Sequence, residues 1–172
     1  MKPILVLCLG NEILSDDSFG FHVSKSLKKM NGDFGSSVEV TFAPLAGFSL
    51  IDYLQGRKSV LVIDTIITGK VPPGTLHCFS MDEMMPSRSL TMSHEISLPT
   101  AVKLARLMGL EGPENIDILA VEAQDVETLS EKMTDPIRAA IAETVEYISG
   151  WIKAKNQESN SYGERIKKIA AP

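Results

Sequence analysis

Short apolar runs alternate with segments of helical periodicity along most of this chain of 172 residues. The run from Ile4 to Leu9 is continuous, which predicts a strand buried on both faces of a parallel sheet. Further strands are expected at 38–42, 59–64, 75–79 and 116–121. Apolar and polar residues alternate at 38–42, so that strand is expected nearer an edge of the sheet.

Apolar residues at helical spacing predict four helices. They are expected at 18–30, from Gly47 to 54, from 93 or 97 to 108, and at 135–155. The third has two possible starts because Pro99 is tolerated only in a first turn. Strands alternating with helices predict a single three-layer α/β domain over residues 1–155, in which helices sandwich a mainly parallel twisted sheet of about five strands. Residues 156–172 are expected to form a polar C-terminal tail with at most one helical turn.

Composition narrows the classes of partner. The net charge is -5, so the chain offers no general attraction for nucleic acid or an anionic membrane, whereas a metal ion or a basic peptide suits it better. The first apolar run is too short for a signal peptide or a membrane span, and a cytoplasmic location is expected. Cys8 and Cys78 lie in strand-like runs and are expected to be buried, inert thiols.

Three titratable side chains stand where a parallel sheet collects functional groups. Asp17 follows the first strand, Asp64 is placed at the end of the third, and His94 lies near the start of the third helix. The carboxyl ends of parallel strands meet at one edge, so these distant residues are able to converge. Two carboxylates and an imidazole suit a divalent transition metal. Taken singly, each residue is better explained by a structural role: Asp17 as a helix cap, Asp64 as a turn former at a strand end, and His94 as an exposed first-turn residue.

Two neighbours of Asp17 are expected to have structural roles. Asp16 should point away from Asp17, to cap the first helix or hold the loop backbone rather than contact metal. Asn11 is expected to orient the loop through hydrogen bonds from its side chain to backbone.

The order of these motifs resembles one known family. The segment from Gly10 to Gly20, with Asn11, Leu14 and the acidic pair, is followed by Val62-Ile63-Asp64 and then by Ser93-His94. This arrangement resembles the hydrogenase maturation endopeptidases, which process the large subunits of nickel-iron hydrogenases, and the resemblance extends to about residue 150.

The resemblance implies a peptidase that removes a short C-terminal extension from the large-subunit precursor after nickel insertion. It implies that Asp17, Asp64 and His94 contact nickel presented by the precursor, and that these same residues carry the catalysis. The cation would polarise the scissile carbonyl or activate water, with one carboxylate as general base or acid, and the sequence leaves these roles open.

Three other functions compete with this one. A non-enzymatic nickel-binding maturation chaperone would use the same three residues. A domain that binds a nucleotide or flavin is disfavoured, because the first loop has no dinucleotide fingerprint and places negative charge where phosphate would lie. A serine or cysteine hydrolase is disfavoured by the absence of a Gly-x-Ser-x-Gly motif.

Overall fold

The computed structural model describes residues 3–30, 34–44, 47–81 and 98–169. Five strands form one sheet in the order β2-β1-β3-β5-β4, with β4 antiparallel to β5 and the other pairs parallel. The strands are β1 (Ile4–Leu9), β2 (Val38–Ala43), β3 (Ser59–Ile66), β4 (Leu76–Ser80) and β5 (Asn115–Glu122). The prediction of a mainly parallel sheet of about five strands is confirmed, and β2 lies at an edge as expected.

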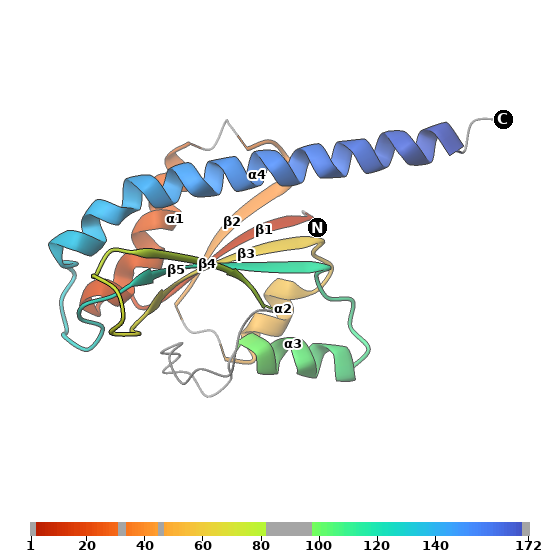
Figure 1. Ribbon diagram of the computed structural model, residues 1–172. Helices are drawn as coiled ribbons and strands as arrows, with labels where there is room; N and C mark the ends of the chain where they lie inside the picture. The colour runs from red at the N-terminus through yellow and green to blue at the C-terminus, as the bar shows by residue number, and fades with distance from the viewer. Residues whose placement is uncertain (1–2, 31–33, 45–46, 82–97, 170–172) are drawn as a thin grey trace.

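The helices cover both faces of this sheet (Figure 1). A short 3-10 helix, η1 (Ser15–Ser18), leads into α1 (Phe19–Lys29), and the others are α2 (Ser49–Leu54), α3 (Leu98–Leu107) and α4 (Asp135–Ile169). In Figure 1, α1 and α4 lie on one side of the sheet, and α2 and α3 lie on the other. The predicted three-layer architecture is therefore confirmed.

Each face of the sheet has its own hydrophobic core. Buried residues of α1 and α4 pack with Val6, Cys8 and Ile63, whereas those of α2 and α3 pack with Leu7 and Val62. Every side chain of β1 is buried, as its continuous apolar run predicts. Each fully buried Leu, Ile or Val side chain contributes about 1.5–3 kcal/mol, so the central strands fix the sheet.

Three details differ from the sequence-based expectations. The helix α4 continues to Ile169 instead of ending near 155, and Figure 1 shows it running past the sheet. The predicted tail, 156–172, is therefore helical up to Ile169. Burial of the Cys8 thiol is confirmed and raises its pKa to about 12, but Cys78 is exposed and its sulfur is hydrogen-bonded to the Tyr147 hydroxyl. The strand β3 runs two residues beyond Asp64.

Within the described residues, no helix is both long enough and apolar enough to cross a membrane.

Candidate active site

The predicted carboxylates meet at the point where the strand order reverses. The chain leaves β1 for β2 on one side and returns to β3 on the other, which is where open α/β sheets form their ligand crevices. Asp17 comes from η1 after β1, and Asp64 comes from β3 itself. Thr65 joins them, because its backbone N–H donates to Asp64 Oδ1 at 2.8 Å and its hydroxyl donates to Asp17 Oδ1 at 3.0 Å. Two of the three predicted site residues thus converge, whereas His94 lies outside the described residues.

The electrostatics of this pair are unusual. Asp64 is only 8% exposed, and its burial is the largest of the effects that raise its pKa from 3.8 to about 7. The hydrogen bond from the Thr65 N–H opposes the rise, and the negative charge of Asp17 adds to it. A carboxyl group in this setting gains from a nearby cation, which would offset both the burial and the repulsion.

The loop that carries Asp17 is held by close backbone contacts. Gly10 has a φ of +133°, and a Cβ at that position would lie 2.1 Å from the Asp17 carbonyl oxygen. Asn11 donates its backbone N–H to that oxygen at 3.1 Å, and its side-chain Oδ1 accepts the Ile13 N–H at 3.2 Å. The predicted role of Asn11 in orienting the loop is confirmed. A Cβ at Gly20 would lie 2.0 Å from the Leu9 carbonyl oxygen, so the close seating of α1 on the end of β1 requires glycine.

Asp16 points away from Asp17 and holds a different part of the chain. Its side chain is fully buried and accepts backbone N–H groups from Gln124, Asp125 and Thr134 at 2.7–3.0 Å, together with the Thr134 hydroxyl at 3.1 Å. Asp16 was expected to hold the backbone of its own loop, but the backbone that it holds follows β5 and precedes α4. Capping of α1 by Asp16 was wrong, since the N-cap of that helix is Ser18, without a side-chain bond.

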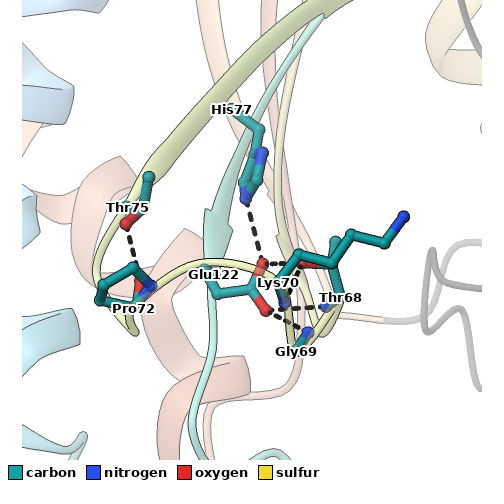
Figure 2. A network of polar contacts seen from close by, with 7 residues as sticks. All are labelled: Thr68, Gly69, Lys70, Pro72, Thr75, His77 and Glu122. Carbon is teal, nitrogen blue, oxygen red and sulfur yellow. Dashed lines mark hydrogen bonds and ion pairs between the residues drawn. The ribbon is translucent and has the colours of Figure 1, made fainter.

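The sequence reasoning missed a second polar cluster at the same sheet edge, shown in Figure 2. The Glu122 carboxylate, at the end of β5, accepts the backbone N–H groups of Thr68 and Gly69, each at 2.8 Å, and the Thr68 hydroxyl at 2.8 Å. His77 Nε2 lies 3.0 Å from Glu122 Oε2. Burial raises the pKa of Glu122, but the hydrogen bonds from Thr68, Gly69 and His77 lower it more, so it lies below its ordinary value. The only sequence signal was a carboxylate directly after an apolar strand.

Comparison with known protein families shows which family this chain belongs to. The family model described as hydrogenase maturation protease matches residues 21–151. The chain belongs to the hydrogenase maturation protease family. It is therefore a peptidase, that is, a hydrolase. The matched range includes Asp64 and His94 and begins after Asp17.

Individual relatives agree with this placement in the maturation protease family. A putative hydrogenase maturation protease of Methanocaldococcus jannaschii is 26% identical over 88% of this chain and 97% of its own. The hydrogenase 2 maturation protease of Escherichia coli is 24% identical over 91% and 94% of the two chains.

Solved structures of maturation proteases share the fold. The hydrogenase maturating endopeptidase HybD from E. coli superposes with a TM-score of 0.73 at 22% identity, covering 88% of this chain and 93% of that one. The HybD protease from Thermococcus kodakarensis gives a TM-score of 0.65 at 20% identity, covering 87% and 98%.

The described part of this maturation protease offers a metal ion two carboxylates. Among the residues that the structure describes, no three His, Cys, Asp or Glu side chains gather as a ready metal site. Asp17 and Asp64 supply oxygen donors that are linked through Thr65, and such donors leave positions open for other ligands. This donor set fits an ion that arrives with ligands of its own.

Proposed function

We propose that this protease removes a C-terminal extension from the large-subunit precursor of a nickel-iron hydrogenase once nickel has been inserted. In this proposal Asp17, Asp64 and His94 contact nickel that the precursor already holds through its own cysteines. Recognition of the metal and cleavage of the peptide are then coupled, because the scissile bond is held beside the ion.

The observation that carries the proposal is that Thr65 donates hydrogen bonds to the carboxylates of both Asp17 and Asp64. The buried Asp64 carboxyl has a pKa of about 7 because it is removed from water and faces the charge of Asp17. Bringing a divalent cation to this pair relieves the repulsion and favours the charged form of Asp64. The site is therefore better matched to a precursor with nickel than to one without it.

Hydrolysis needs a water molecule and a proton transfer at this pair. Water adds to the scissile carbonyl carbon, the carbon–nitrogen bond breaks, and the leaving amine takes up a proton. Nickel in the precursor supplies Lewis acidity to this step. One of the two carboxylates takes the proton from water and makes it available to the amine.

The test is to incubate the purified protein with nickel-loaded and nickel-free precursor and to measure product masses. We expect a shortened product from the loaded precursor alone. Equal cleavage of both forms would show that cleavage does not depend on recognition of nickel. Binding of nickel-loaded precursor without shortening would instead support a chaperone.

Matched variants locate the site. Asp17→Asn and Asp64→Asn each remove a charge with little change in shape, and each should lower kcat/KM for the loaded precursor by about 100-fold, in the range seen when charged groups are lost from active sites. Asp52→Asn removes a charge from an exposed position on α2 and should leave cleavage unchanged. Equal activity of all three variants would show that the site lies elsewhere.

A further inference from the structure

His77 shares a row of the sheet with Asp64. In the strand register Asp64 pairs with Ala120 of β5, and Ala120 pairs with His77 of β4. Ala120 belongs to the core on the α2 and α3 side, and Phe79, two residues after His77, packs against that same core. Because side chains in register share a face, His77 and Asp64 both project toward the side of α2 and α3, with Ala120 between them in the register.

Glu122 sets the hydrogen-bonding state of the His77 ring. Its carboxylate is 2% exposed and is fixed by Thr68 and Gly69, so it acts only as an acceptor (Figure 2). The Nε2 atom of His77 therefore donates to Glu122 Oε2. In the neutral ring Nδ1 is then an acceptor, and within the described residues it has no hydrogen-bond partner. The His77 side chain is 25% exposed, so the ring that carries this acceptor is partly open to solvent.

The spacing suits an extended peptide. Neighbouring strands are about 4.8 Å apart, so the backbones of Asp64 and His77 are separated by about 10 Å. An extended chain rises about 3.3 Å per residue, and about three residues span that distance. A precursor segment that passes Asp64 in an extended conformation therefore brings a backbone N–H to His77 about three residues further along.

We propose that His77 is a substrate-contact residue of this protease, which accepts a backbone N–H of the precursor about three residues from the scissile bond that the proposed function places near Asp64, with Glu122 as its positioning residue. The inference rests on the proposed function. It adds a recognition point on β4 that the metal-contacting residues do not supply.

Two substitutions separate contact with substrate from support of the fold. His77→Gln places an amide nitrogen near the position of Nε2, so it retains the bond to Glu122 and loses the acceptor at Nδ1. His77→Asn places an amide oxygen near Nδ1 and cannot reach Glu122. Cys78→Ala is the matched control, because Cys78 is the next residue of β4 and contacts Tyr147 of α4 on the opposite face.

The experiment measures kcat and KM of the full chain for nickel-loaded precursor, together with melting temperature. For His77→Gln we expect KM to rise about three- to tenfold, with kcat within about twofold and an unchanged melting temperature, as for the loss of one hydrogen bond to substrate. For His77→Asn we expect KM near the wild-type value with a lower melting temperature. Cys78→Ala should keep the wild-type KM.

Other outcomes overturn the inference. A wild-type KM for His77→Gln would mean that His77 only supports Glu122, and a fall in kcat at constant KM would mean that it acts in the chemical step instead of in binding. Normal cleavage by the wild-type protein accompanied by either result removes this inference alone. A wild-type protein that leaves the loaded precursor intact removes the proposed function and this inference with it.

Discussion

Replacing Asp64 with Asn should remove a pH-dependent loss of stability. In the folded protein the Asp64 carboxyl is 8% exposed, and its pKa is raised to about 7 by burial and, to a smaller degree, by Asp17. In the unfolded chain the group returns to its ordinary pKa of 3.8. A raised folded-state pKa for an acid means that the folded protein holds the proton more tightly, so the contribution of Asp64 to stability is highest below pH 4 and falls as the pH rises toward 7.

The size of this effect follows from the shift. One pKa unit corresponds to about 1.4 kcal/mol, so a shift of about three units amounts to about 4 kcal/mol once the pH exceeds both values. At pH 5 the folded carboxyl is still protonated and only part of the loss has occurred. Between pH 5 and pH 8 the Asp64 carboxyl should lower the free energy of unfolding by about 3 kcal/mol. The Asn variant keeps an acceptor for the Thr65 N–H and lacks this pH-dependent loss of stability, because an amide does not ionise.

Urea denaturation at several pH values tests the reasoning. The difference in unfolding free energy, Asp64→Asn minus wild type, should grow by about 3 kcal/mol between pH 5 and pH 8. Asp52→Asn, at an exposed position, should show no such growth. A difference that stays constant over this range would refute the raised pKa, and with it the electrostatic argument for a cation at the pair.

Two further substitutions test the frame around the site. Asp16→Asn should lower the free energy of unfolding by about 3–5 kcal/mol in urea titrations. The fully buried Asp16 carboxylate now accepts hydrogen bonds from backbone N–H groups, and in the variant an amide nitrogen, itself a donor, would face some of them. An unchanged urea midpoint would show that the segment after β5 needs no such anchor. Gly20→Ala should cost about 1–3 kcal/mol, because its Cβ would lie 2.0 Å from the Leu9 carbonyl oxygen. Wild-type melting temperature for this variant would contradict the close contact between α1 and β1.

Local sequence patterns were enough to predict most of the fold. The continuous apolar run of β1 and the helical spacing in α1 are properties of neighbouring residues, so the sequence was enough to locate them. The end of α4 was missed because polarity alone does not stop a helix. The exposure of Cys78 was missed because its strand is an edge strand, and strand order is a property of the whole sheet.

The sequence by itself determined that Asp17 follows one strand of a parallel sheet and that Asp64 lies near the carboxyl end of another, which is sufficient to predict that they converge. Only the tertiary structure placed Thr65 between them, brought Asp16 to backbone N–H groups more than 100 residues away, and joined His77 to Glu122. Each of these contacts depends on strand register and loop path. Each strand's apolar pattern decides which side chains face a core, but these contacts also depend on which strands and loops lie next to each other, and that is decided by packing between distant parts of the chain.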